Sequence, residues 1–539
     1  MDQLTILFAI FLASIFSVPL GRRIGLPSPV LMTLFGAVMA LLPQVPNPNL
    51  DPDLILPIVL PPLLFAAARR THWRQFRASW RTVLLLAVLL VLVTTAAVAG
   101  VYSLLSPGLP IGAAVLLGAL ISPPDPVAAS AVAADLSLPR RLTSTLETEG
   151  LFNDVTAVVI YEVAVTAVVS HHFSAPEALG EFALSAVIAT AIGLGLGWCS
   201  SRATNLLGDD ATLQVSLNLL IPYAAYAAAD RLHGSGVLAV LVYGLYLSGK
   251  TDADDVAYRL VGTAFWDIVE LLVTGFAFGL IGQELYVVVS AVGDHWTALL
   301  GDAMTVVAVV VLARLLWLLP AAWLANRLSG SRVGDDDVGA AVDEGDAKPI
   351  TWRETVVMWW AGMRGVVTVA LALAIPLTVD GGAAFPGRDA ILFTAFAVVL
   401  FTIVVQGLTL PVLVRALGVG ADDRAEREAE RRLWFRVAKA ELRRLNEAVE
   451  SGAVPEDLYE RLASRQHGRL AQACPEAVDE ELRASAKKRF GEAKQLHRLD
   501  QEMIAAGRRE MIMARSEPGV DPELVDRVMR RLDLRSERH

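Results

Sequence analysis

Cysteine is almost absent from this chain: its 539 residues include two, Cys199 and Cys474. Two isolated cysteines form neither a disulfide framework nor a cysteine-based metal site, so redox chemistry is not expected. The sequence also lacks a His-Glu-x-x-His metal motif and a Gly-x-Ser-x-Gly elbow, which argues against a membrane-embedded enzyme or a bound cofactor. The formal net charge is -10 and no basic face is interleaved with aromatic residues, so nucleic acid is not an expected partner.

Hydrophobic residues, in contrast, make up 54% of the chain, and its mean hydropathy is +0.51. Apolar windows of roughly 20 residues recur up to about residue 416, the length that a helix needs to cross a bilayer. The sequence therefore predicts an all-α polytopic membrane protein with roughly thirteen spans. These spans are expected near 3–19, 28–43, 54–68, 82–104, 111–135, 149–170, 178–200, 212–229, 235–249, 262–284, 301–325, 354–378 and 389–414.

Basic residues in the loops test this topology, because cytoplasmic loops are enriched in Lys and Arg. Alternate loops hold about sixteen basic residues, from Arg22 and Arg23 to Arg353, whereas the intervening loops hold little beyond Arg231 and Arg388. The asymmetry predicts an N-terminus outside and a C-terminal tail inside. The first span has no basic flank before it, unlike a cleavable signal, so we expect it to be retained.

The composition changes abruptly after Pro411, where the chain becomes rich in Glu, Arg, Lys and Ala. We therefore divide the chain into a transmembrane domain, 1–416, and a cytosolic helical domain, 417–539. Apolar positions such as Leu433 and Val437 suit a helix face packed on another helix. A small helical bundle or a dimer contact is favoured over a ligand-sensing domain, since the tail has no nucleotide-binding glycine loop.

Three spans carry residues that are costly in a membrane, and the first contains the segment Ser122-Pro123-Pro124-Asp125-Pro126. Each proline removes a backbone N–H donor, and an interior proline clashes with the preceding turn, so the helix is expected to unwind here. Transporters build cation sites from such breaks, because freed carbonyl oxygens coordinate the ion. A proline kink with no ion near it is the structural alternative.

The second segment is Glu149-Gly150-Leu151-Phe152-Asn153-Asp154, at the start of an apolar run. Ionisable groups inside a span mark ion paths by default. Glu149 and Asp154 are five residues apart and point in different directions around a helix. Asp154 lies deeper in the apolar run, where one carboxylate can hold either a proton or a cation such as Na⁺, and this mutual exclusion is the minimum machinery of an antiporter. Asn153 can hydrogen-bond the unwound segment without titrating.

The third segment holds Arg364 within Gly362-Met363-Arg364-Gly365. A buried arginine keeps its charge and needs a partner, and the sequence predicts that Glu149 pairs with it. Asp267 and Glu270, three residues apart near a cytoplasmic end, are expected to form an attractive vestibule or to be plainly solvated. Arg314 lies deep in its span, and the sequence leaves its partner open among Asp267, Glu270 and Asp302.

Pro-Asp-Pro-Val at 124–127, Glu-Gly-Leu-Phe-Asn-Asp at 149–154 and Gly-Met-Arg-Gly at 362–365 resemble signature segments of the monovalent cation:proton antiporter family. This family contains the bacterial NhaP-type and the eukaryotic Na⁺/H⁺ exchangers. The resemblance covers residues 1–416 and leaves the tail uncovered.

The resemblance implies that Asp154 is the ion-binding and proton-carrying aspartate and that Asn153 marks the electroneutral branch. It also implies that Glu149 and Arg364 form a stabilising ion pair and that Asp125 belongs to an unwound crossing helix. The implied fold is a homodimer of inverted repeats with broken crossing helices. It has a core domain and a dimerisation domain and works by an elevator-like movement in the plasma membrane.

The chain departs from the family pattern at three positions: Pro124 replaces a common Thr, Gly150 a common Ser, and Thr274 a common Asn. The first two departures remove hydroxyl ligands. Backbone carbonyls at Ser122, Pro123 and Pro124, or water, are then expected to complete the coordination of the hard cation Na⁺.

The sequence thus predicts proton-coupled exchange of a monovalent cation, with Na⁺ favoured and K⁺ or Li⁺ as alternatives, one cation for one proton. A passive cation channel is a more remote alternative, because no repeated selectivity filter occurs.

Overall fold

The computed structural model describes residues 3–42, 45, 51–70, 84–125, 138–171, 175–208, 210–250, 256–293, 296–329, 351–420 and 423–451, and a few isolated positions after residue 500. The chain divides into two compact units, Met1–Ala421 and Asp422–His539. The first unit holds all the segments singled out above.

Helices make up the first unit, and across its described ranges no strand occurs beyond an isolated bridge between Thr378 and Ala384. The helices up to the middle of this unit are α1 (Gln3–Ile24), α2 (Ser28–Ala40), α3 (Pro52–Arg70), the π-helical turn η1 (Leu84–Leu89), α5 (Leu90–Leu105), α6 (Ile111–Ile121), α8 (Arg140–Val169), α9 (Ala175–Leu207) and α10 (Ala211–Arg231). They continue with α11 (Gly236–Ser248), α12 (Val256–Val292), α13 (Trp296–Ser329), α14 (Trp352–Trp360), α15 (Val366–Leu373), α16 (Arg388–Phe401), the π-helical turn η4 (Thr402–Gln406) and α17 (Gly407–Leu417).

Eight helical segments of the described chain are long and apolar enough to cross a membrane, and three shorter apolar helices, α2, α6 and α11, accompany them. The predicted all-α membrane protein is therefore confirmed. The number of thirteen spans stays a prediction. Within the expected span 111–135 the described helix ends at Ile121, and the expected span 354–378 is divided into α14 and α15.

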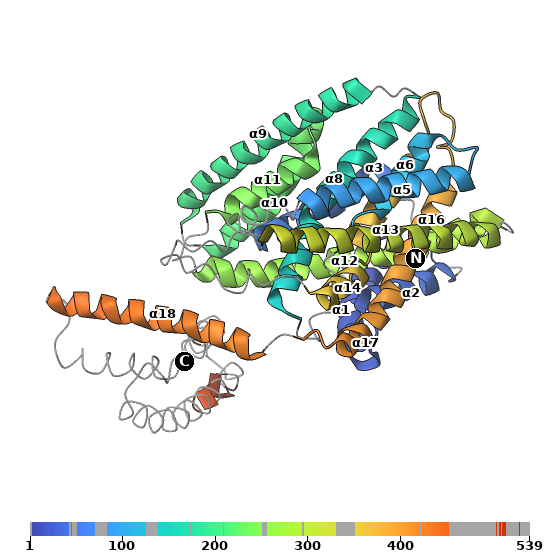
Figure 1. Cartoon of the computed structure of the whole chain (residues 1–539). Coiled ribbons are helices and arrows are strands. Elements are labelled where there is room, and N and C mark those ends of the chain that lie inside the picture. The colour runs from blue at the N-terminus through green and yellow to red at the C-terminus, as the bar shows by residue number, and fades with distance from the viewer. Residues whose placement is uncertain are drawn as a thin grey trace. The chain divides into compact units, whose positions relative to one another are not determined.

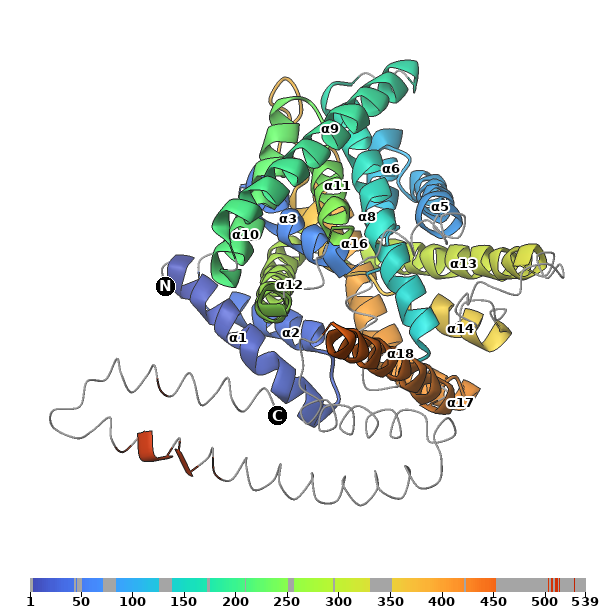
Figure 2. The ribbon, with the colours of Figure 1, turned by 90° about the vertical axis from the view of Figure 1, so that its left-hand side faces the viewer.

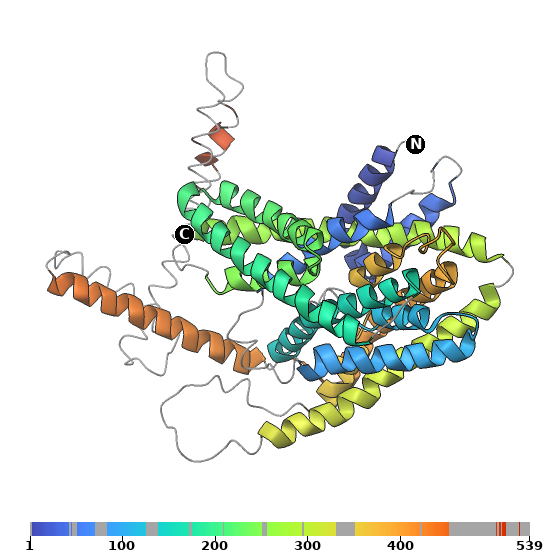
Figure 3. The ribbon, with the colours of Figure 1, turned by 90° about the horizontal axis from the view of Figure 1, so that it is seen from above.

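The helices form two neighbourhoods joined by long helices. On one side α9, α10, α11 and α3 pack together, and on the other α5 packs against α6 and α13 (Figures 1 and 2). Seen from above, α5 in light blue and α13 in yellow-green lie next to each other along one edge (Figure 3). The 30-residue α8 packs against α6, and the 37-residue α12 packs against α1, α2 and α10.

Small residues bring α2 and α12 into close contact. A Cβ added at Gly36 would lie 2.0 Å from the carbonyl oxygen of Gly279, and one at Gly282 would lie 2.1 Å from that of Thr33. Transmembrane helices associate through such small residues because their backbones can then approach closely. This contact fixes one wall of the cavity described below.

The second unit is described mainly by α18 (Asp423–Glu450), a 28-residue helix rich in charged residues. Leu433 and Val437, which were predicted to pack against another helix, are exposed in the described residues, at 58% and 44%. Most of the later tail falls outside the described residues, so its cytosolic location and its role stay predictions.

Candidate functional site

The middle of α8 places Glu149, Asn153 and Asp154 inside the protein, with exposed fractions of 2%, 0% and 9%. A separation of five residues turns the two carboxylates to different sides of the helix, as expected. Each carboxylate consequently has its own surroundings, and those surroundings differ in charge.

Glu149 forms a buried ion pair with Arg314 of α13. Arg314 Nη1 donates to Glu149 Oε1 at 2.6 Å and Nη2 donates to Oε2 at 3.2 Å, while each side chain is at most 2% exposed. Arg314 also donates to the carbonyl oxygen of Met358 from Nε and from Nη2, at 3.3 and 3.2 Å. Two parallel bonds between a guanidinium and a carboxylate are the strong form of this contact. The prediction that Glu149 pairs with Arg364 is therefore wrong in its partner.

Arg364 instead binds backbone carbonyls. Its Nε donates to Ile121 O at 2.9 Å and its Nη2 to Ser122 O at 3.2 Å, and Nη1 donates to Gly362 O. The last carbonyls of a helix lack partners within it and carry partial negative charge. Arg364 is thus held without a direct ion pair, by capping the C-terminal end of α6, while Glu149 acts on it through a longer-range electrostatic interaction.

Asp125 holds the start of α15 in a complementary way. Its Oδ2 accepts a hydrogen bond from Val366 N at 3.1 Å, and its own backbone N–H donates to Met363 O at 2.6 Å. A carboxylate at a helix N-terminus satisfies a free N–H group and the positive end of the helix dipole. Gly365 is required beside it, because an added Cβ would lie 1.5 Å from Asp125 Oδ2.

The end of α6 therefore meets the interruption between α14 and α15 at this point, and each segment caps the other. The segment 122–125 follows α6, and the segment 361–365 separates α14 from α15. The break at 122–125 was predicted from its prolines. The resemblance implied broken crossing helices, but the sequence did not place a break at 361–365, although two glycines that flank Met363 and Arg364 signal it.

Asn153 joins α8 to this crossing, since its Nδ2 donates to the carbonyl oxygen of Pro124 at 3.4 Å. Its Oδ1 is buried and has no hydrogen-bond partner among the described residues. Asp154 interacts electrostatically with Asp125, and no described residue donates a hydrogen bond to its carboxylate or forms an ion pair with it. Two consecutive residues of α8 thus carry a carboxylate and an amide oxygen that have no hydrogen-bond partner among the described residues.

The three carbonyls predicted as ligands of a cation differ in their present contacts. Ser122 O accepts from Arg364 and Pro124 O accepts from Asn153, while no contact is described for that of Pro123. A carbonyl oxygen has two lone pairs, so one hydrogen bond leaves it able to accept another partner. The Ser122 hydroxyl is turned back to Ala119 O at 3.1 Å.

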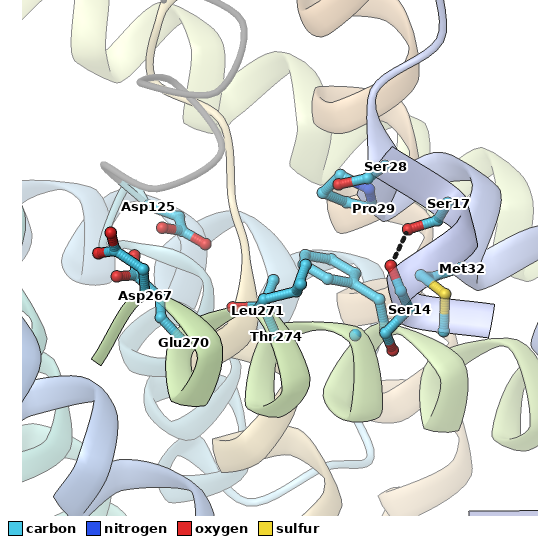
Figure 4. A pocket seen from close by; sticks show the side chains of 12 residues that line it. Ser14, Ser17, Ser28, Pro29, Met32, Asp125, Asp267, Glu270, Leu271 and Thr274 are labelled. Carbon is cyan, nitrogen blue, oxygen red and sulfur yellow. Dashed lines mark hydrogen bonds between the residues drawn. The ribbon is translucent and has the colours of Figure 1, made fainter. Parts of the chain in front are cut away.

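A cavity of about 230 Å³ reaches Asp125 from one side. Its wall includes Asp267, Glu270 and Thr274 of α12, and Ser14 and Ser17 of α1. Figure 4 shows the carboxylates of Asp125, Asp267 and Glu270 gathered at one end of the cavity, with the two serines at the other. The structure thus brings the two predicted vestibule residues into one cavity with the aspartate of the broken helix.

A transmembrane sodium/hydrogen exchanger family model matches residues 8–416 of the chain. The chain belongs to this family. Among its relatives, the low-affinity Na⁺/H⁺ antiporter NhaS1 of Synechocystis is 31% identical over 474 residues, 87% of this chain and 83% of the relative. The Na⁺/H⁺ antiporter ApNhaP of Aphanothece halophytica is 32% identical, over 75% of this chain and 71% of the relative.

One relative has a broader name: a sodium, potassium, lithium and rubidium/H⁺ antiporter of Bacillus pumilus is 29% identical, over 72% of this chain and 58% of the relative. Among solved structures, the antiporter MjNhaP1 of Methanocaldococcus jannaschii superposes with a TM-score of 0.58 at 20% identity, over 77% of this chain and 99% of that chain. This exchanger therefore has the antiporter fold, and it is a multi-pass membrane transporter of the cation/proton antiporter class.

Two charged side chains of the exchanger acquire roles that the sequence did not assign. Arg314 pairs with Glu149 and with none of the three expected candidates, Asp267, Glu270 and Asp302. Arg70, at the end of α3, was expected only to be a basic loop residue. Arg70 Nη2 donates to Asp267 Oδ1 at 3.1 Å and to Glu270 Oε2 at 2.5 Å. The depth of Arg314 in an apolar span signalled that it needed a partner, whereas no sequence signal joins Arg70 to residues nearly two hundred positions later.

Proposed function

We propose that this exchanger transports Na⁺ against H⁺, one for one, with Asp154 as the group that binds them alternately. The observation that carries the proposal is the contrast in charge compensation around the crossing. Glu149 is held by Arg314, Arg364 by carbonyls, and Asp125 by the N-terminus of α15, whereas Asp154 has no such partner among the described residues. Because a proton and a monovalent cation each neutralise one carboxylate, exchanging them moves no net charge.

Asn153 Oδ1, Asp125 and the carbonyls of Ser122, Pro123 and Pro124 are the proposed further oxygen ligands. They suit a hard cation, which prefers several oxygen atoms. Their supply from backbone and amide groups compensates for the hydroxyls that Pro124 and Gly150 remove. From the family resemblance we further propose a homodimer in the plasma membrane, with an elevator-like movement, an outside N-terminus and a cytosolic tail.

The test is proton exchange in vesicles that contain the purified protein. Added Na⁺ is expected to dissipate a preset pH gradient, and Asp154→Asn is expected to abolish this dissipation because the amide cannot carry the proton. Glu162→Gln is the matched control: it neutralises a carboxylate on the same helix, two turns farther along and exposed, and it should retain exchange. Retained exchange in Asp154→Asn would contradict the proposal.

Stoichiometry and cation choice need two further arms of the same assay. A one-for-one exchange is insensitive to an imposed membrane potential, so strong potential dependence would exclude it. K⁺/H⁺ exchange is the second candidate, favoured by the name of the Bacillus relative. Replacing Na⁺ with Li⁺, K⁺ or Rb⁺ at equal concentration distinguishes these cations by their initial rates.

A further inference from the structure

Arg70 is half-exposed and forms ion pairs with two residues of the acidic wall of the cavity. A single nitrogen, Nη2, donates to Asp267 at 3.1 Å and to Glu270 at 2.5 Å, and it thereby links the last residue of α3 to α12. The Arg70 and Asp267 side chains are 45% and 59% exposed, whereas that of Glu270 is 14% exposed. Glu270 therefore contacts the guanidinium on one side and lines the cavity that leads to Asp125 on the other.

Two further charged residues, one on α3 and one on α8, interact with this contact. Arg69 of α3 interacts electrostatically with Asp267, and Glu147 of α8 interacts with both Arg70 and Glu270. Carboxylates at the mouth of a low-dielectric cleft raise the local concentration of cations. A guanidinium bound to those same carboxylates lowers that attraction, because it satisfies them with a charge of its own.

We propose that Arg70 sets the apparent affinity of the exchanger for its cation, by competing as a tethered cation for Glu270 and Asp267. The inference rests on the proposed function, since it needs a cation to enter by this cavity. The half-exposed position makes the competition weak, because solvent screens such an ion pair. Arg70 therefore tunes entry by a small factor and does not block it.

A purely structural link between α3 and α12 predicts a different result. Loss of such a link would lower the maximal rate or the folded yield, but it would leave the half-saturating cation concentration unchanged. Measuring the maximal rate and the half-saturating cation concentration separately therefore distinguishes a residue that sets the affinity from one that only supports the structure.

The first experiment measures the initial rate of pH-gradient dissipation against Na⁺ concentration in vesicles. Arg70→Gln is expected to lower the half-saturating Na⁺ concentration about two- to fivefold, the range that an exposed ion pair supplies. Arg70→Lys, which keeps the charge, should stay close to the unaltered protein. Arg202→Gln on α9 is the matched control, an exposed arginine that lies over Trp198. An unchanged or higher half-saturating concentration in Arg70→Gln would overturn the proposal.

A double-substitution cycle tests the named competitor. Glu270→Gln removes the main carboxylate for which Arg70 competes, so Arg70→Gln should have little further effect in that background. Equal effects of Arg70→Gln with and without Glu270 would overturn the proposal. Absence of cation-driven exchange in the unaltered protein, with any of Na⁺, Li⁺, K⁺ or Rb⁺, would instead refute the proposed function.

The rate of cysteine modification in the cavity can be measured even if a variant does not transport. Thr274 lies four residues after Glu270 on α12 and lines the cavity. In a background with Cys199→Ser and Cys474→Ser, Thr274→Cys is treated with a cationic and with a neutral methanethiosulfonate reagent. Arg70→Gln should raise the cationic-to-neutral ratio of the reaction rates, and an unchanged ratio would argue against the competition.

Discussion

Glu149 and Asp154 lie on one helix, five residues apart, but their surroundings differ in charge. Glu149 accepts two hydrogen bonds from a guanidinium, whereas the described residues give Asp154 an electrostatic interaction with another carboxylate, Asp125, and no ion pair. The first carboxylate contributes to holding α8 against α13, whereas the second is a buried charge without such compensation among the described residues. Burial alone therefore does not distinguish the two carboxylates, because the compensation of their charge must be known as well.

Removing the partner of Glu149 is the most severe test of this contrast. Arg314→Met leaves a buried carboxylate unpaired and is expected to lower the free energy of unfolding by about 3–5 kcal/mol. Adding Glu149→Leu should restore most of that loss, since two apolar side chains need no compensation. Thermal unfolding of the purified protein measures both variants. A double variant as unstable as Arg314→Met would show that the ion pair does not explain the effect.

The next largest loss of stability is expected at Arg364, which donates hydrogen bonds to backbone carbonyls and not to a carboxylate. Arg364→Lys keeps the charge but loses the planar fork that reaches Ile121 O and Ser122 O together. We expect a loss of about 1.5–3 kcal/mol in stability, because one of these buried carbonyls loses its charged donor. Thermal unfolding again provides the measurement, and unaltered stability would mean that a point charge satisfies both carbonyls.

A similar or smaller loss of stability is expected when Gly365, which packs against Asp125, is replaced by Ala. In Gly365→Ala the added methyl group displaces the Asp125 carboxylate, at a cost of about 1–3 kcal/mol for overpacking. Exchange should fall as well, because the broken helix shifts next to Asp154. Gly100→Ala on α5 is the control, since a Cβ there meets nothing within 4 Å. Equal exchange rates for the two variants would contradict the tight approach at Gly365.

The smallest change in stability is expected at Asp154, although we expect its substitution to abolish exchange. Asp154→Asn removes an uncompensated buried carboxylate, so the thermal unfolding temperature should stay the same or rise. Glu149→Gln, the parallel substitution in the same helix, should lower it. An equal loss of stability in both variants would contradict the conclusion that Glu149 is stabilised by an ion pair and Asp154 is not.

Much of this fold was predictable from sequence because hydrophobic run length and proline placement act locally. The break after Ile121 and the inward position of Asp154 follow from residues within a few turns of each other. The partner of Glu149 could not be predicted in this way, because the sequence shows which charges need compensation but not which helices are neighbours. Pairing of charged side chains alone favours Arg364 as the partner of Glu149, but in the fold backbone carbonyls bind Arg364.

The π-helical turn Thr402–Gln406 sets the helical register at the end of the membrane unit. It holds the Thr402 hydroxyl where it accepts the backbone N–H of Arg364, at 3.1 Å. Beyond it, Leu410 and Val414 of α17 are buried beside Met358, and Thr409 accepts a hydrogen bond from Trp360 at 2.7 Å. Deleting one residue of this turn would rotate every later side chain by about 100°. The wide turn therefore acts as a spacer that lets one helix present the correct face at both of its ends.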